Sequence, residues 1–352
     1  MNKVLITGSS GLVGSEAVEF FSKKNFEVIG IDNNFRKKLF GKIADNNPNL
    51  IRLKKKYKNF HHKNTDIRNI KALRKIFKKN NKKIKCIIHA AAQPSHDWAA
   101  KAPMVDFSIN AQGTLNLLEL ARTFCPAATF IFVSTNKVYG DKPNSQRLIE
   151  KKKRWEIHPK SRYSKGIDEK MSIDNCVHSL FGVSKSAADL MVQEYGKNFK
   201  MNTGVFRAGC ITGPYHSGAQ LHGFLNYIVK TNLTKKKYTI FGYKGKQVRD
   251  NIHSFDIINC FWEFHKKPKK GEIYNIGGGR NNSCSIIEVM EKIQNKTKIR
   301  FNFKVSKKNR VGDHIWYISN NSKFKSHYKK WRIKFNLDNI LNEIIKNEKK
   351  KN

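Results

Sequence analysis

Short apolar runs alternate with amphipathic stretches over the first part of the chain, up to about residue 140. Each short run predicts a buried strand: 3–6, 27–31, 60–63, 86–89 and 129–133. Apolar residues at helical spacing between these runs predict helices over 14–23, 70–79 and 114–123. Strands and helices in alternation are typical of βαβ units, so we expect a parallel sheet covered by helices.

The pattern becomes less regular further along the chain. Apolar patterns there predict a helix over 184–198, strands at 202–206, 238–241 and 272–276, and a C-terminal helix over 337–352. Residues 142–177 are polar, charged and aperiodic, which predicts a long structureless segment that is functional or mobile.

These elements predict an α/β fold with a Rossmann-type, doubly wound parallel sheet and a smaller C-terminal α/β domain. We expect a dinucleotide-binding domain over 1–206, to which later strands can return. Residues 207–352 would then form a substrate domain.

The chain carries a formal net charge of +42, from 69 Lys and Arg against 27 Asp and Glu. Such a charge can serve nucleic-acid binding. Here the basic residues are mostly lysines dispersed along the chain, and asparagine is also abundant, which favours a general compositional bias. Nucleic acid is therefore not expected as the main partner, although the charge favours small anionic ligands.

Neither a membrane segment nor a metal site is indicated. No stretch reaches the roughly 18 consecutive apolar residues of a membrane span. The first apolar run ends at once in a Gly-rich turn, unlike a secretory leader. The six cysteines include no C-x-x-C pair, which argues against zinc and against a disulfide framework. We expect a cytoplasmic protein.

A glycine-rich turn follows the first predicted strand and opens the first predicted helix, with Gly8, Gly11 and Gly14 at its fixed points. In a dinucleotide-binding turn the first glycine allows the tight bend, and the second lets backbone approach a pyrophosphate. The third lets the helix pack closely on the strand. Leu12 and Val13 lie at the helix N-terminus, whose free N–H groups favour phosphate.

The second predicted strand is followed by an acidic residue, Asp32. A carboxylate there accepts both ribose hydroxyls of a dinucleotide and repels a 2′-phosphate, so NAD is expected rather than NADP. Asn33 adjoins it, and Arg36 lies near enough to keep NADP open. Small residues after the fourth strand let a cofactor pass close to the backbone: Ala90, Ala91 and Ala92.

Together these residues resemble the extended short-chain dehydrogenase/reductase family, the NAD-dependent epimerases and dehydratases. The segments that carry the resemblance, besides the Gly turn, are Asp66-Ile67-Arg68, His89–Ala92, Asn110 with Gly113-Thr114, Ser134–Gly140, Gly245–Asp250, Tyr274–Gly278 and Arg310–Asp313. The segment after Ser134, the one ending in His178-Ser179, and Gly245–Asp250 are most similar to the CDP-paratose 2-epimerases.

The resemblance implies roles for particular residues. Asp66 would bind adenine, and Asn110 would support the active-site lysine and a water. Lys185 would hold the nicotinamide ribose, and Thr135 would bind the sugar hydroxyl that is oxidised. The full expected cofactor set is Gly8, Gly11, Leu12, Val13, Gly14, Asp32, Asn33, Arg36, Asp66, Ile67, Ala90, Ala91, Ala92, Asn110 and Lys185.

The resemblance also implies contacts to a nucleotide-sugar substrate. Arg249 and Arg310 would grip its diphosphate, because a guanidinium group can bond bidentately. Asp313 would help to seat the nucleotide. Asn136 and Lys137 are also expected at the substrate, and they stand where a dehydratase has an acidic pair, so dehydration is disfavoured.

One position departs from the family pattern. The family's acid/base is a tyrosine four residues before the lysine, and here that position is Phe181. Helical spacing keeps Phe181 and Lys185 on one face, but the phenol oxygen is absent. Loss of a general base typically costs about 10²–10⁴ in rate.

Three explanations for this departure are open. Another group can carry the proton, and the candidates are His178, Cys176, Cys210 and His96, of which an imidazole has the better pKa. The chain can have kept the cofactor and changed the reaction. It can also be catalytically silent, a protein that binds NAD and senses its redox state.

We therefore expect an NAD-dependent epimerase of a nucleotide-activated, CDP-linked sugar. Two other interpretations remain: a silent NAD-binding regulator, and an RNA-binding relative of the fold. The family's usual dimer packs two helices per subunit, here the helix carrying Leu115, Leu117, Leu118 and Leu120 and the one that follows Phe181. A homodimer or a homotetramer is expected.

Overall fold

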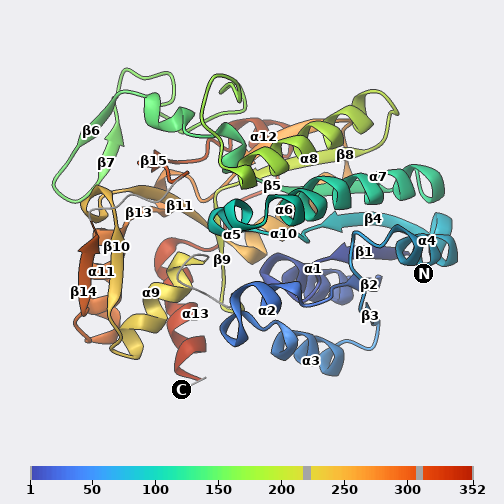
Figure 1. Cartoon of the computed structure of the whole chain (residues 1–352), viewed down its shortest axis with the longest axis horizontal. Coiled ribbons are helices and arrows are strands. Elements are labelled where there is room, and N and C mark those ends of the chain that lie inside the picture. Colours follow the sequence, from blue (N-terminus) through green and yellow to red (C-terminus); the bar gives the residue numbers. More distant parts are fainter. Residues whose placement is uncertain (1, 217–222, 307–311, 351–352) are drawn as a thin grey trace. The chain divides into compact units, whose positions relative to one another are not determined.

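The computed structural model describes residues 2–216, 223–306 and 312–350. The chain forms two compact units (Figure 1). The first unit comprises Met1–Val138, Leu180–Arg207 and Ile258–Tyr274. The second comprises Tyr139–Ser179, Ala208–Ile257 and Asn275–Asn352. A single boundary after residue 206 does not describe these units, because the chain leaves the first unit at Tyr139 and returns to it twice.

A seven-stranded sheet forms the centre of the first unit, with the strand order β12-β8-β5-β4-β1-β2-β3. Its strands are β1 (Lys3–Thr7), β2 (Glu27–Ile31), β3 (Phe60–Lys63), β4 (Ile84–His89), β5 (Thr129–Thr135), β8 (Thr203–Ala208) and β12 (Glu272–Ile276). β1 pairs in parallel with both β2 and β4, so the chain winds outward from β1 in two directions. The expected doubly wound Rossmann-type sheet is confirmed.

Helices cover both faces of this sheet (Figure 1). They are α1 (Leu12–Lys23), α2 (Phe35–Phe40), α3 (Asn47–Lys56), α4 (Ile70–Asn80), α5 (His96–Lys101), α6 (Pro103–Phe107), α7 (Gly113–Phe124), α8 (Leu180–Lys197) and α10 (Ser254–Lys266). On one face, α4, α7 and α8 share a buried apolar cluster with the strands. On the other, α1 meets α10 where Phe21 packs edge-on against Trp262. Strands buried on both faces explain why the sequence shows them as continuous apolar runs.

Among the elements that were expected, the observed bounds mostly agree, and the main difference lies in α8. The helices α3 and α10 were not expected from the sequence pattern. Helix α8 begins at Leu180 rather than at residue 184. Gly182 has a low helix propensity and concealed the first turn in the sequence pattern. Because α8 starts early, Phe181 and Lys185 are one turn apart on a single helix.

The second unit contains smaller sheets. Its strands are β6 (Leu148–Glu150), β7 (Trp155–Ile157), β9 (Cys210–Thr212), β10 (Tyr238–Phe241), β11 (Val248–His253), β13 (Ser283–Ser285), β14 (Phe303–Ser306) and β15 (Trp316–Tyr317). β11 lies between β13 and β15 and also pairs with β9. The helices are α9 (Phe224–Leu233), α11 (Ile286–Thr297), α12 (Ser322–His327) and α13 (Leu337–Lys349), and α9, α11 and α13 share an apolar core.

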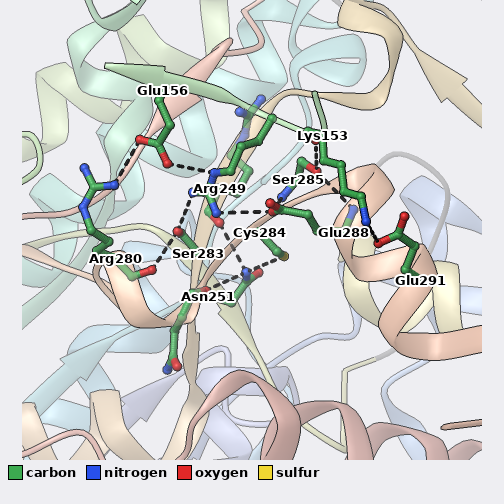
Figure 2. A network of polar contacts seen from close by, with 12 residues as sticks. Lys153, Glu156, Arg249, Asn251, Arg280, Ser283, Cys284, Ser285, Glu288 and Glu291 are labelled. Carbon is green, nitrogen blue, oxygen red and sulfur yellow. Dashed lines mark hydrogen bonds and ion pairs between the residues drawn. The ribbon is translucent and has the colours of Figure 1, made fainter. Parts of the chain in front are cut away.

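The expectation of a structureless segment over residues 142–177 was wrong. Its β6 and β7 form an antiparallel hairpin, and Arg154 joins that hairpin to Ser283 (Nη2 to Oγ 2.8 Å) and Glu288 (Nη1 to Oε2 3.3 Å). Figure 2 shows the surrounding network, in which Glu156 meets Arg280 and Lys153 meets Glu291. Three-residue strands are too short to show a period, and these ion pairs join residues far apart in sequence.

No helix in the described part of the chain is long and apolar enough to cross a membrane.

Candidate functional site

The glycine turn between β1 and α1 is shaped by backbone contacts. Gly8 has φ +68°, and a Cβ on it would lie 2.8 Å from Ala91 N. A Cβ on Gly14 would lie only 2.0 Å from Gly8 O. Gly11 differs, because its φ is −74° and its nearest neighbour would be Gly8 O at 3.3 Å. The fold itself therefore requires Gly8 and Gly14, whereas close packing does not explain Gly11.

The start of α1 leaves backbone donors available for an anion. Its N-cap residue is Gly11, which has no side chain to cap the first N–H groups, and Leu12 and Val13 open the helix. This end of α1 lies at the point where the strand order reverses, between β1 and β4. In open α/β sheets a crevice forms at such a switch point, and ligands bind there.

Asp32 ties the glycine turn to the end of β2. Its Oδ2 accepts a hydrogen bond from Ser10 N at 2.9 Å, and its Oδ1 accepts one from Asn34 N at 2.7 Å. Arg36 lies over the Phe40 ring, 5.4 Å from the ring centre, and burial lowers the pKa of this guanidinium to about 10.

Asp66 is held in a salt bridge at the end of β3. Arg68 donates to both of its oxygens, from Nε at 3.0 Å and from Nη2 at 2.7 Å, and Asn33 Nδ2 donates to Oδ2 at 3.0 Å. These donors outweigh burial and lower the pKa of the Asp66 carboxyl. Ile67 is buried against Gly113 at the start of α7.

The backbone after β4 passes directly beside the glycine turn. Ala90 N donates to Thr7 O (3.3 Å), and Ala91 N donates to Thr7 Oγ1 (3.2 Å). His89 bridges Thr7 Oγ1 (2.7 Å) and Thr114 Oγ1 (2.9 Å), and burial lowers its pKa to about 3. His89 is therefore a neutral structural bridge between β1 and α7.

Lys185 contacts β5 close to its carboxyl end, where Thr135 is the last residue. The Lys185 side chain is buried, its Nζ donates to Val133 O at 2.9 Å, and it lies 4.0 Å from the centre of the Phe132 ring. Burial lowers the pKa of this ammonium group to about 7. Thr135 ends the same strand, and its Oγ1 accepts a hydrogen bond from Lys137 N at 3.2 Å. The expected pair is thus brought to one strand end.

Phe181 fills its position with a buried phenyl ring, 6% exposed. The imidazole of His96, the first residue of α5, packs against it edge to face, with ring centres 5.1 Å apart and planes at 69°. The sequence placed His96 only after strand four, and the structure brings it to Phe181.

A buried polar network surrounds Asn110, which lies in a π-helical turn before α7. Its Oδ1 accepts from Gln93 N at 2.9 Å, and its Nδ2 donates to Asp106 Oδ1 and to Ser184 Oγ, each at 3.1 Å. Burial raises the pKa of the Asp106 carboxyl. Gln93 adjoins the small residues after the fourth strand, whereas Asp106 belongs to no recognisable motif and was not expected at the site.

A second buried network, also absent from the sequence analysis, supports β5 and α8. Arg207 donates to both oxygens of Asp189, from Nε at 3.0 Å and from Nη2 at 2.9 Å. Ser134 Oγ donates to Asp189 Oδ2 at 2.7 Å. This pair fixes the helix that carries Lys185 against the strand that carries Thr135.

Other expected site residues lie in the second unit. Arg249 Nη2 lies 3.6 Å from Asp313 Oδ1, so this expected pair is brought together. Cys176 Sγ lies 3.8 Å from both ring nitrogens of His178, and burial raises the pKa of the Cys176 thiol. Arg310 lies outside the described residues.

Cys210 begins β9, beside Asn251 of β11. No cluster of three or more histidine, cysteine or acidic side chains is placed to hold a metal ion in the described ranges.

Comparison with known proteins gives consistent results. The model of the NAD dependent epimerase/dehydratase family matches residues 4–277. The CDP-paratose 2-epimerase of Salmonella typhi is 32% identical over 308 residues, covering 86% of each chain. The UDP-glucuronate 4-epimerase of Thermodesulfobacterium geofontis is 28% identical and covers 84% of this chain and 82% of its own.

Solved structures show the same fold. The UDP-glucose 4-epimerase of Bifidobacterium longum, in complex with NAD+ and UDP, superposes with a TM-score of 0.79 at 20% identity, covering 100% of this chain and 99% of that one. The dTDP-glucose 4,6-dehydratase of Bacillus anthracis, in complex with NAD, gives 0.77 at 22% identity, with 99% and 97% covered.

Proposed function

We propose that this chain, which belongs to the NAD dependent epimerase/dehydratase family, is an epimerase that inverts one carbon of a CDP-activated sugar by transient oxidation. The observation that carries the proposal is the placement of Lys185 on the backbone of β5, at Val133 O, two residues before Thr135 ends that strand. The 32% identity with a CDP-paratose 2-epimerase supports the choice of a CDP-linked sugar.

The residues around the glycine turn fit NAD. The uncapped start of α1, at Gly11, Leu12 and Val13, offers N–H groups to the pyrophosphate. Asp32 presents a carboxylate to the adenosine ribose, where it disfavours the 2′-phosphate of NADP. Arg36 packs against the Phe40 ring, and we expect NAD to remain preferred over NADP in its presence.

Further along the cofactor, Asn33 and Asp66 would border the adenine, with Ile67 beneath them in the core. Ala90, Ala91 and Ala92 would let the nicotinamide half pass close to the backbone. Bound NAD supplies the oxidant, and the protein supplies orientation and electrostatics.

At the reacting end, Thr135 would hydrogen-bond the sugar hydroxyl, and Lys185 would hold the nicotinamide ribose. A lysine with a pKa of about 7 is partly protonated near neutral pH. It can donate a hydrogen bond to the ribose in either charge state. Asn110 acts on Lys185 indirectly, because its described bonds go to Asp106, Gln93 and Ser184.

Substrate binding would involve the second unit. Arg249 and Arg310 would hold the diphosphate, and Asp313 orients Arg249. Asn136 and Lys137 would contact the sugar, and their lack of a carboxylic acid favours epimerisation over dehydration. His178 remains a candidate for proton transfer beside Cys176.

We also infer that the chain forms a homodimer or homotetramer through α8. Val183 and Leu190 on that helix are 45% and 49% exposed, although both are large and apolar. On α7 the leucines expected at the interface behave differently, because Leu117, Leu118 and Leu120 are buried within the chain. Their side chains belong to the core, so α8 carries the apolar surface of this proposal.

The experiment is a product assay on a panel of CDP-, UDP-, GDP- and dTDP-sugars, including CDP-paratose, with NAD binding measured in parallel. Conversion of a CDP-sugar to its epimer supports the proposal. NAD binding without turnover favours the silent regulator instead, a reading that Phe181 motivates. Tight RNA binding with a steep salt dependence would favour the RNA-binding alternative.

A further inference from the structure

We propose that His96 is the proton acceptor and donor of the reaction, in place of the tyrosine that this chain lacks, and that Phe181 serves as the wall that positions its imidazole. The inference rests on the proposed function. It selects one group among the four candidates that the sequence left open.

The geometry places an imidazole against the ring that stands in place of the phenol. Phe181 precedes Lys185 by one turn of α8, and its ring is in contact with the His96 ring at 5.1 Å between centres. A phenol oxygen would project from the rim of the Phe181 ring, and the imidazole packs against this same ring. His96 is partly exposed, whereas Phe181 is 6% exposed, so a substrate can reach the imidazole.

A chain of hydrogen bonds joins the two segments that carry these rings. Asn110 Oδ1 accepts from Gln93 N, which lies in the segment that leads to His96. Asn110 Nδ2 donates to Ser184 Oγ at 3.1 Å, and Ser184 Oγ donates to Phe181 O at 3.1 Å. This buried network gives Asn110 a positioning role that does not depend on contact with the lysine.

The start of α5 is held as well. Ser95 Oγ accepts from Trp98 N at 3.3 Å and caps the helix that begins at His96. Trp98 Nε1 donates to Leu39 O at 2.9 Å, which anchors α5 to the last turn of α2. An acid/base side chain on an anchored helix keeps the same position relative to the substrate in both half-reactions.

Other groups near the site fit less well. His89, a buried histidine outside the four candidates, has both ring nitrogens bonded to threonine hydroxyls, and burial lowers its pKa to about 3, so it does not take a proton near neutral pH. The Cys176 thiol has a raised pKa, which keeps it protonated, and His178 makes its described contact to that thiol. His96 is the imidazole in contact with the Phe181 ring.

The proton and electron balance is simple. In the forward half, the sugar hydroxyl gives its proton to a neutral nitrogen of His96, and the carbon gives up a hydride to NAD+, which leaves a ketone. In the return half, a hydride comes back to the opposite face of that carbon, and the His96 imidazolium returns its proton to the oxygen. An imidazole is a side chain that can both take and return a proton near neutral pH.

The first test is a set of variants assayed on the nucleotide sugar that the wild type converts. His96→Asn is expected to lower turnover by about 10²–10⁴-fold with NAD affinity unchanged. His61→Asn, on the exposed half of β3, is the matched control and should retain full activity. Adding Phe181→Tyr to His96→Asn should restore part of the lost rate, because a phenol then stands beside Lys185. Full activity in His96→Asn overturns the proposal.

The second test reads the imidazole without turnover. Histidine NMR titrations of the wild type, assigned by the signal lost in His96→Asn, are recorded with and without NAD+. The cationic nicotinamide ring should lower the pKa of His96 and leave that of His61 unchanged. No effect of NAD+ on the His96 signal overturns the proposal even if the variant is poorly folded. A wild type that converts no sugar overturns the proposed function and this inference with it.

Discussion

Replacing Lys185 with methionine should make the cofactor-free protein more stable at neutral pH. This gain in stability over the wild type should shrink as the pH rises. The Lys185 side chain is 3% exposed, and burial lowers its pKa from 10.5 to about 7. In the unfolded chain the same ammonium keeps its proton up to about pH 10.4. Between these values the native state binds fewer protons than the unfolded state, so this group makes stability rise with pH. Below about pH 7 the buried Lys185 is charged, and the full free-energy cost of burying its ammonium group is present.

The magnitude follows from the size of the pKa shift. Each pKa unit corresponds to about 1.4 kcal/mol, so the buried ammonium costs roughly 5 kcal/mol at most below pH 7. Methionine removes that cost but leaves Val133 O without its donor, which costs about 1–3 kcal/mol. We expect a net gain of roughly 2–4 kcal/mol near pH 6.5, falling by about 1.4 kcal/mol per pH unit above pH 7.

The assay is urea unfolding of cofactor-free protein followed by circular dichroism, at about pH 6.5 and about pH 9. Lys197→Met is the matched control, because Lys197 ends the same helix but is exposed, and its effect should be small at both pH values. A Lys185→Met variant that is less stable than wild type near pH 6.5, or a difference that does not change with pH, would refute this reasoning.

Four further outcomes follow from the contacts. Gly14→Ala, whose Cβ would lie 2.0 Å from a backbone oxygen, should lower the free energy of unfolding by roughly 1–3 kcal/mol in urea melts. Gly11→Ala should leave stability nearly unchanged but weaken NAD binding about tenfold or more by calorimetry. Asp32→Ala should cost about 1.5–3 kcal/mol of NAD affinity and narrow the preference over NADP. Asp189→Asn should destabilise the protein by about 3–5 kcal/mol in the same melts, because Arg207 is left buried without its partner charge; equal stability to wild type would contradict the role of that pair.

The sequence predicted the doubly wound sheet well because its strands are buried on both faces. β2, β3 and β12 of this sheet have the expected bounds, as does β10 of the second unit. The hairpin of β6 and β7 was missed because each strand has only three residues and its anchors are distant ion pairs.

The site was predictable where a motif carries it and not where packing alone assembles it. The glycine turn follows from local spacing, and the resemblance pointed to Lys185, whose Nζ the structure places on Val133 O. The contact between His96 and Phe181 joins α5 to α8, and no pattern within either segment reveals it. The buried carboxylate of Asp106 is likewise visible only once the π-helical turn is formed.

The phenylalanine at position 181 is therefore compatible with two functions, which a chemical assay can distinguish. A silent NAD-binding protein and an epimerase with a substituted base would share the same glycine turn, Asp32 and Lys185. They differ in whether a sugar carbon is inverted, and in whether the hydrogen on that carbon comes from the sugar itself or from the solvent.

The most direct measurement is proton NMR of the converted nucleotide sugar after incubation with the NAD-loaded protein in deuterated water. Transient oxidation with return of the same hydride predicts an epimer whose inverted carbon carries no solvent deuterium. Deuterium at that carbon would mean enolisation instead, and no epimer from any sugar of the panel would contradict the epimerase assignment itself.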